Sequence, residues 1–324
     1  MTIGDGFERR NDLLLDSRLG RTPRHYFGVK GQPLMLVPDD IRKCTVFICR
    51  KYMLSGRSEA ESLLPDGTGF FVSVPIPEIA AGAGVVYVVT AKHVIEKSPT
   101  RSLDNHIYIR VNSVNGPPAI IATDPGDWVT HPTDASVDVA VLTVGAIDSN
   151  VYDYKHFSTN MAATKEIIEK NGIGVGDEIF LTGLFVNHYG QKRSLPIVRV
   201  GNIALMPEEP ITSGNKLMDA YLVEARSIGG LSGSPVFVHL IGPRPGGATS
   251  LGGQIYWLGL MHGHWDGRLS DADAVRGDPE AVNMGIAIVI PVEKILEVLN
   301  QDLFVKQREE SIAGYRSKHA PTPD

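Results

Sequence analysis

A serine set among glycines is the residue of this sequence best placed to do chemistry. Ser232 lies in Gly229-Gly230-Leu231-Ser232-Gly233-Ser234-Pro235, which leads into an apolar run. A serine hydroxyl needs an adjacent base, and acyl transfer also needs donors directed at the oxyanion. A preceding glycine lets the backbone turn so that the N–H groups of Gly230 and Ser232 point to one spot. The stretch therefore offers a nucleophile and an oxyanion hole, although most glycine–serine clusters form ordinary turns.

A base and a residue to orient it occur earlier in the chain. His93 follows the apolar run Tyr87-Val88-Val89-Thr90-Ala91, and Asp138 opens the apolar run Val137-Asp138-Val139-Ala140-Val141-Leu142. A carboxylate is costly to bury unpaired, and a histidine N–H is a natural partner for it. In this interpretation Asp138 fixes the tautomer of His93, which takes the proton of Ser232.

Each of these assignments has a simpler alternative. A histidine after a strand is usually an exposed residue, and Asp138 is also suited to capping a turn. Asp134 is close enough in sequence to compete with Asp138 for the histidine. The residues alone leave these readings open.

The elements that must hold these residues are short strands separated by turn signals. Six candidates precede residue 149 and six follow residue 174. The first set is Lys43–Tyr52, Thr68–Val74, Val85–Thr90, His106–Val111, Ala119–Thr123 and Val137–Val144. The second set is Glu178–Phe185, Leu195–Ala204, Ala220–Ala225, Pro235–His239, Ile255–Met261 and Gly285–Ile290. This rhythm predicts an all-β fold of two six-stranded antiparallel β-barrels.

Two helices complete the expected organisation. Residues 161–170 predict a linker helix, and apolar residues at helical spacing predict a C-terminal helix that begins near Pro291. The predicted units are an N-terminal extension (1–41), an N-terminal barrel (42–148), a linker with its helix (149–174), a C-terminal barrel with its helix (175–303) and a flexible tail (304–324). A short helix is possible within the extension, around residues 11–19.

Composition narrows the classes of partner. The 324 residues are 43% hydrophobic and 21% charged with a net charge of -6, which fits a globular protein and gives no sign of nucleic-acid binding. No signal peptide or membrane-spanning stretch is evident, so we expect a cytoplasmic protein without a membrane partner.

The Cα atoms of Cys44 and Cys49 would lie about 16 Å apart on one strand, which is too far for a disulfide. We expect both to be packing residues.

Three motifs in order resemble the active-site motifs of trypsin-like (chymotrypsin-fold) serine peptidases. They are Thr90-Ala91-Lys92-His93-Val94, Asp138-Val139-Ala140-Val141-Leu142 and Gly230-Leu231-Ser232-Gly233-Ser234-Pro235. The order His, Asp, Ser is that of the chymotrypsin type. Further stretches resemble the bacterial HtrA-like branch, namely Gly67-Thr68-Gly69-Phe70, Gly176-Asp177-Glu178-Ile179 and Arg199-Val200-Gly201-Asn202-Ile203. The resemblance covers roughly residues 42–300 and implies hydrolysis of a polypeptide through an acyl-enzyme, with no cofactor or metal.

The chain also departs from the family pattern. Leu231 stands where trypsin has an aspartate that pairs with a newly cut N-terminus, and no activation sequence of the Ile-Val-Gly-Gly type occurs. Activation by cleavage is therefore not expected, and the site should be constitutive or gated in another way. The residues after Ser232 leave no room for the PDZ domain of many HtrA proteins.

Residues that could select the substrate lie near the expected pocket. The segment Gly259-Leu260-Met261-His262-Gly263-His264-Trp265-Asp266 resembles the strand that lines this pocket, and Arg226 aligns with its base. Arg226, His262, Gly263 and His264 thus raise the hypothesis of an acidic or amide P1 residue. Two alternatives remain. His262 could hydrogen-bond near Asp138 while Arg226 pairs with Glu224, or His262, His264 and Asp266 could bind a metal.

Two function classes follow from the sequence. The first is a serine endopeptidase with the triad His93, Asp138 and Ser232. The second is a chymotrypsin-fold module for binding or regulation, with a latent or gated site. Esterase-like hydrolysis of small acyl groups is a third use of the same chemistry. The oligomeric state and the physiological substrate do not follow from the sequence.

Overall fold

The computed structural model describes residues 37–52, 62–144, 147–213, 216–226, 229–243, 249–267 and 282–318. Most of the expected N-terminal extension, with its possible helix at 11–19, lies outside these residues. The described chain opens with the short helix α1 (Asp39–Lys43). No helix in this part of the chain has both the length and the apolar character needed to cross a membrane.

The N-terminal unit is one mostly antiparallel sheet, in the order β5-β4-β1-β2-β3-β7-β6 with β8 paired to β2. All six expected strands are found, and the short β6 and β8 are additional. The strands are β1 (Thr45–Lys51), β2 (Leu63–Pro75), β3 (Gly84–Thr90), β4 (Ile107–Val111), β5 (Ala119–Thr123), β6 (Val129–Thr130), β7 (Ala140–Thr143) and β8 (Phe157–Ser158). Its ladder forms a half-barrel rather than a closed ring. Helix α2 (Lys92–Arg101) and the 3₁₀ turn η4 (Pro125–Asp127) lie within this unit.

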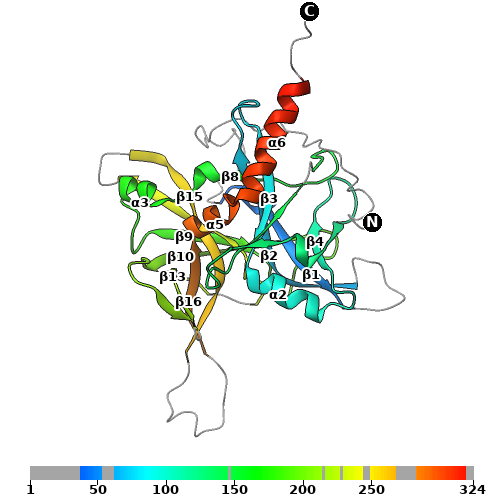
Figure 1. The fold of residues 1–324 in the computed structure, drawn as a ribbon. Coiled ribbons are helices and arrows are strands. Elements are labelled where there is room, and N and C mark those ends of the chain that lie inside the picture. Colours follow the sequence, from blue (N-terminus) through cyan, green and yellow to red (C-terminus); the bar gives the residue numbers. More distant parts are fainter. Residues whose placement is uncertain are drawn as a thin grey trace, which may run out of the picture.

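The C-terminal unit is a closed six-stranded barrel in the order β10-β13-β16-β15-β14-β9. Its strands are β9 (Glu178–Gly183), β10 (Ile197–Leu205), β13 (Tyr221–Glu224), β14 (Pro235–Pro243), β15 (Thr249–Gly267) and β16 (Val282–Pro291). A hairpin of β11 (Ile211–Ser213) and β12 (Lys216–Met218) is additional. The two units stand side by side in Figure 1. The all-β class with two barrel-like units is therefore confirmed.

The linker helix is shorter than expected. It begins four residues later than predicted, because α3 spans Lys165–Asn171 and a separate 3₁₀ turn, η5 (Thr159–Met161), precedes it. Gly172 ends the helix in the left-handed conformation, with φ of 60°, where glycine pays no steric penalty. The C-terminal helix α5 (Val292–Leu299) begins directly after Pro291, as predicted.

The segment expected to be a flexible tail instead forms helix α6 (Asp302–Lys318). Although its sequence is mostly polar, Phe304 and Arg308 contact β3 of the N-terminal unit. The Phe304 ring stacks edge-on against Tyr87 with centroids 5.2 Å apart, and the Arg308 guanidinium donates to the Tyr87 hydroxyl at 3.1 Å. In Figure 1, α6 is the red helix that begins against this unit and extends away from it.

The seam between the units is filled by buried aromatic side chains. Phe70 and Phe157 come from the N-terminal sheet, and Phe180, Phe237 and Trp257 come from the C-terminal barrel. The Phe157 ring contacts both Phe237 and Trp257, with centroids 5.1 Å and 5.2 Å apart. Offset and edge-on aromatic pairs add about 0.5–1.5 kcal/mol each beyond the area that they bury. This packing fixes how the two units face each other.

Both cysteines are free and buried, so the prediction of two packing thiols is confirmed. Burial raises the pKa of the Cys49 thiol to about 12. The thiolate, which is the reactive form, is therefore suppressed at neutral pH.

The packing of α6 predicts that this helix is part of the folded unit. Replacing Phe304, which is 1% exposed, by alanine should lower the free energy of unfolding by about 3–5 kcal/mol, because it leaves a cavity against Tyr87. The matched control is Leu303→Ala on the same helix, where the side chain is 52% exposed and the change should stay within about 0.5 kcal/mol. Urea titrations of both variants provide the measurement. Equal destabilisation by the two would contradict the packing role.

Candidate active site

Strand pairing brings His93 and Asp138 together. Strands β3 and β7 are antiparallel neighbours, and Thr90 at the end of β3 lies opposite Ala140 at the start of β7. His93 therefore follows one strand and Asp138 precedes the other at the same edge. His93 lies in the first turn of α2, and not simply at a strand end, while Asp138 lies two residues before β7.

The Asp138 carboxylate is held by His93 through both of its oxygens. The His93 backbone N–H donates to Oδ1 at 2.8 Å, and the ring Nδ1 lies 2.7 Å from Oδ2. Burial opposes ionisation of this carboxyl, but the hydrogen bonds from His262 and His93 outweigh it and hold its pKa well below the ordinary value. An ionised carboxylate is an acceptor only, so Nδ1 of His93 donates this hydrogen bond, and in the neutral imidazole that tautomer leaves Nε2 as the acceptor nitrogen.

A second histidine shares the same carboxylate oxygen. His262 Nδ1 lies 2.5 Å from Asp138 Oδ2, and the two imidazole rings stand edge-on with centroids 5.4 Å apart. The alternative in which His262 hydrogen-bonds to Asp138 is thus confirmed. The His262 ring is committed to Asp138 by this bond, so Nδ1 is not available to bind a substrate side chain.

Ser232 lies beside this cluster, in the turn between β13 and β14. Its Oγ donates to the backbone carbonyl of His262 at 3.0 Å, and among the described residues no hydrogen bond joins it to the His93 ring. The structure therefore brings all three predicted residues to one place. It shows the histidine–aspartate contact formed and the serine–histidine contact not formed.

The turn around Ser232 requires glycine at two positions. Gly230 has φ of 96°, and a Cβ there would lie 2.8 Å from Val186 Cγ1. Gly233 has φ of 86°, and a Cβ there would lie 2.0 Å from the carbonyl oxygen of Thr68. The side chain of Leu231 is buried in the core of the C-terminal barrel. An apolar group thus fills the position where trypsin carries its aspartate.

The remaining predicted specificity residues lie on or next to strands of the C-terminal barrel, and Gly263 directly follows His262 in the chain. Arg226 is exposed just beyond the end of β13. Gly263 and His264 lie on β15 opposite Ile288 and Ala287, and His264 is exposed. A register shift on each side of this pair interrupts the regular alternation of the strand. The sequence-based metal alternative of His262, His264 and Asp266 includes an aspartate whose side chain lies outside what the structure describes.

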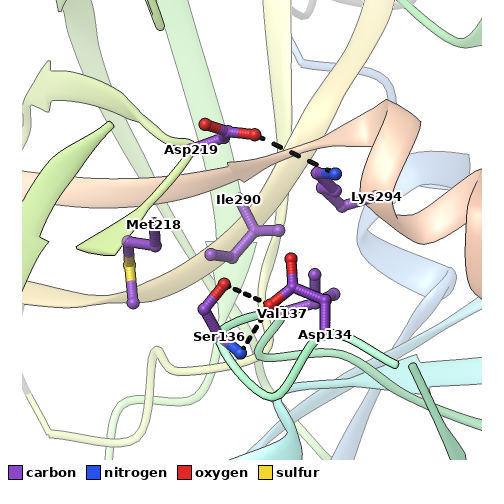
Figure 2. Close-up of a pocket in the computed structure, with 7 residues that line it drawn as sticks. All are labelled: Asp134, Ser136, Val137, Met218, Asp219, Ile290 and Lys294. Atoms are coloured by element: carbon purple, nitrogen blue, oxygen red, sulfur yellow. Dashed lines mark hydrogen bonds and ion pairs between the residues drawn. The ribbon is translucent and has the colours of Figure 1, made fainter. Parts of the chain in front are cut away.

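Asp134, the competitor for Asp138, has a different role. Its Oδ1 accepts from the backbone N–H of Ser136 at 2.8 Å and from the Ser136 hydroxyl at 2.6 Å, and these bonds lower its pKa. Figure 2 shows it at the edge of a small pocket, opposite the Asp219–Lys294 ion pair. Asp134 therefore caps a turn, and Asp138 is the aspartate that meets the histidines.

One metal-type grouping occurs within the described part of the chain, and it differs from the one considered from sequence. His93, Asp138 and His262 place one ligand atom each within 4.8 Å of one another. Hydrogen bonds between the two rings and the carboxylate already account for this geometry. The arrangement therefore needs no ion to explain it.

Comparisons with known proteins bear on the fold alone. No family model matches the chain, and no curated protein matches its sequence. The MamO protease domain of Magnetospirillum magneticum in its apo form is 16% identical, with 81% of this chain and 98% of that chain covered and a TM-score of 0.46. The active form of the Rv3671c protease of M. tuberculosis is 16% identical, with 81% of each chain covered and a TM-score of 0.38. The inactivated protease paralogue S-I1 of the scabies mite is 13% identical, with 82% and 97% covered and a TM-score of 0.41. At these values we draw no activity from the similarity.

The lowered pKa of Asp138 predicts a pH-dependent contribution to stability. A carboxyl whose pKa is lower in the folded state stabilises the fold fully above its unfolded pKa of about 3.9 and loses that contribution as the pH falls through the folded value. Asp138→Asn should therefore be less stable than the native protein at pH 5, and the gap should narrow as the pH falls below about 4. Urea titrations at several pH values measure it. A gap that stays constant or widens below that pH would contradict the assignment.

Proposed function

We propose that this chain is a serine endopeptidase that uses His93, Asp138 and Ser232 as its triad. The observation that carries the proposal is the pairing of a buried, ionised carboxylate with His93 beside a glycine-bounded serine. The closed barrel and half-barrel sheet support it, because they are the architecture of the chymotrypsin fold. Within that class, the glycine-flanked Thr68 motif and the opening of the second barrel favour the HtrA-like branch.

The proposed reaction uses the free nitrogen of His93. Ser232 Oγ attacks the carbonyl carbon of the peptide bond while His93 Nε2 takes the hydroxyl proton. The N–H groups of Gly230 and Ser232 donate to the oxyanion that forms. His93 then gives its proton to the leaving amine as the C–N bond breaks. Water attacks the resulting ester in the same way, and Ser232 recovers its proton.

The Asp138 carboxylate keeps His93 suited to this role. Because it accepts from Nδ1, it selects the tautomer in which Nε2 can take the proton of the serine, and it stabilises the imidazolium that follows. His262 donates to the same oxygen and so holds the carboxylate from a third direction. The carboxylate is fixed by donors on two different units of the fold.

A second function is favoured by the resting position of Ser232. Its hydroxyl is engaged by the His262 carbonyl, so it must rotate away before it can meet His93. A chain that remained in this state would be a chymotrypsin-fold module for binding or regulation. If the endopeptidase function holds, substrate entry supplies the rotation, and the site is gated locally and not by cleavage of the chain.

The substrate class is an extension of this proposal. An acidic or amide P1 side chain would meet the exposed Arg226 and His264, while Gly263 leaves backbone open for an added strand. The His262 ring acts on Asp138 in this version and takes no part in the pocket. Arg226 and His264 are therefore the two residues that the P1 hypothesis depends on.

Labelling with a fluorophosphonate probe tests the triad. The native protein should label, and Ser232→Ala should not label at all, because the probe bonds to the serine oxygen. Asp138→Asn should reduce the labelling rate by roughly 10³–10⁴-fold by releasing the wrong tautomer of His93. Ser234→Ala is the matched control, since this neighbouring hydroxyl is buried and has no hydrogen-bond partner in the described structure.

Three outcomes of this experiment are decisive. A native protein that does not label supports the latent or binding module. Labelling that survives Ser232→Ala refutes the assignment of the nucleophile. Labelling of a protein that hydrolyses small esters but cleaves no peptide would indicate the esterase-like use of the same site.

A peptide library that varies P1 tests the substrate class. We expect cleavage after Glu or Gln, and Arg226→Ala should reduce the preference for Glu over Phe, measured as a ratio of kcat/KM, by roughly tenfold. Arg316→Ala, an exposed arginine on α6, is the charge-matched control and should leave the ratio unchanged. An active enzyme that cleaves after Phe or Arg and ignores Glu and Gln would refute the hypothesis.

A further inference from the structure

A buried threonine of the N-terminal unit reaches into the turn that holds Ser232. Thr68 lies on β2 between Gly67 and Gly69, and it is fully buried. A β-branched residue that is stiff at χ1 holds its hydroxyl in a defined direction. The sequence showed only its glycine neighbours, and its partners are far away along the chain.

The Thr68 hydroxyl makes two hydrogen bonds, both to the C-terminal unit. It donates to the carbonyl of Gly230 at 2.7 Å and accepts from the backbone N–H of Leu184 at 2.9 Å. The hydroxyl thereby satisfies one acceptor and one donor that would otherwise be buried without a partner. Leu184 directly follows β9, so the turn is tied to the barrel wall through this one oxygen.

The backbone of Thr68 adds two more links at the same place. Its N–H donates to the carbonyl of Ser232 at 2.9 Å, and its carbonyl accepts from the hydroxyl of Thr90 at 2.6 Å. Thr90 ends β3, three residues before His93. One residue therefore contacts both the serine turn and the strand that leads to the histidine.

The backbone of Gly233 packs too closely against Thr68 and Thr90 to carry a side chain. A Cβ on Gly233 would lie 2.0 Å from the Thr68 carbonyl oxygen and 2.5 Å from Thr90 Oγ1. Gly230 has a positive φ that glycine adopts freely, so its own conformational preference does not hold the turn in one shape. The hydrogen bond that the Gly230 carbonyl accepts from Thr68 restricts the turn.

We propose that Thr68 is a positioning residue that holds the oxyanion turn in its working shape. By fixing the carbonyl of Gly230 it fixes the peptide plane between Gly230 and Leu231, which lies between the two proposed oxyanion donors, the N–H groups of Gly230 and Ser232. This inference rests on the proposed function, since it assigns a task within the same site. It adds that the oxyanion hole is built jointly by the two units.

Two substitutions at Thr68 distinguish the effect of its hydroxyl from the effect of its branched shape. Thr68→Val keeps the branched side chain and removes both hydrogen bonds of the hydroxyl. It should slow fluorophosphonate labelling by roughly 10- to 100-fold, because the N–H groups that donate to the oxyanion would be misplaced. Thr68→Ser keeps the hydroxyl and should restore a rate close to native.

The matched control is Thr123→Val, in β5 of the N-terminal unit. The buried Thr123 hydroxyl also donates to a carbonyl, of Ile107 at 3.0 Å, and accepts an N–H, from Trp128 at 3.1 Å. Its loss removes the same kinds of bond away from the serine turn. Thr123→Val should label at the native rate when all variants are compared below their melting temperatures.

Hydrogen exchange read by mass spectrometry keeps the test independent of activity. Peptides that cover residues 229–235 should exchange faster in Thr68→Val than in the native protein, Thr68→Ser and Thr123→Val. If the native protein does not label, the proposed function fails, and the exchange result alone decides whether Thr68 holds the turn. Native labelling by Thr68→Val, or unchanged exchange in these peptides, would overturn the inference.

Discussion

The packing of aromatic rings between the two units is the constraint on which the rest of this structure depends. The triad candidates come from both sides of the seam, with His93 and Asp138 on the N-terminal sheet and Ser232 on the turn before β14. Their meeting therefore requires a rigid orientation of one unit on the other. The edge-on contacts of Phe157 with Phe237 and Trp257 supply it, because the interior is close-packed and aromatic pairs prefer a defined relative geometry.

A buried negative charge is the second constraint. The Asp138 carboxylate would be costly in an apolar seam without donors, and it receives three, from the His93 backbone, the His93 ring and the His262 ring. These donors come from α2 on one side and from β15 on the other. The carboxylate thus connects the two units and also holds the ring of His93, the proposed base. The His262 backbone also holds the Ser232 hydroxyl, so one residue of β15 contacts two members of the proposed triad.

The last helices of the described chain, α5 and α6, also connect the two units. After the last barrel strand, α5 and α6 return to the N-terminal unit, where the Gln301 amide donates to the carbonyl of Thr130 at 2.9 Å and Phe304 packs on Tyr87. The buried side chains of α5 and Phe304 belong to the same hydrophobic core as the aromatic residues of the seam. The two helices therefore extend the packing that joins the units.

The sequence by itself determined the strand rhythm, the all-β class and the identity of the residues that meet. Alternation and turn signals are local, so all twelve expected strands and the helix after Pro291 could be predicted from their own residues. The sequence could not show that α6 is ordered, because its overall composition is polar and only a few anchors, such as Phe304 and Arg308, find partners on β3. It also could not show that the first sheet stays a half-barrel, which depends on which edges pair.

Only the tertiary structure decided which residues of the site contact one another. The sequence favoured Asp138 and left Asp134 as a nearby competitor, and the β3–β7 register places Asp138 on His93. A register shift in β15 lies at His262, whose ring contacts that carboxylate and whose carbonyl accepts from the Ser232 hydroxyl. The partners of Thr68 are 116 and 162 residues away in the chain. Contacts at such separations leave no periodic signal in one sequence, because they depend on how two finished units meet.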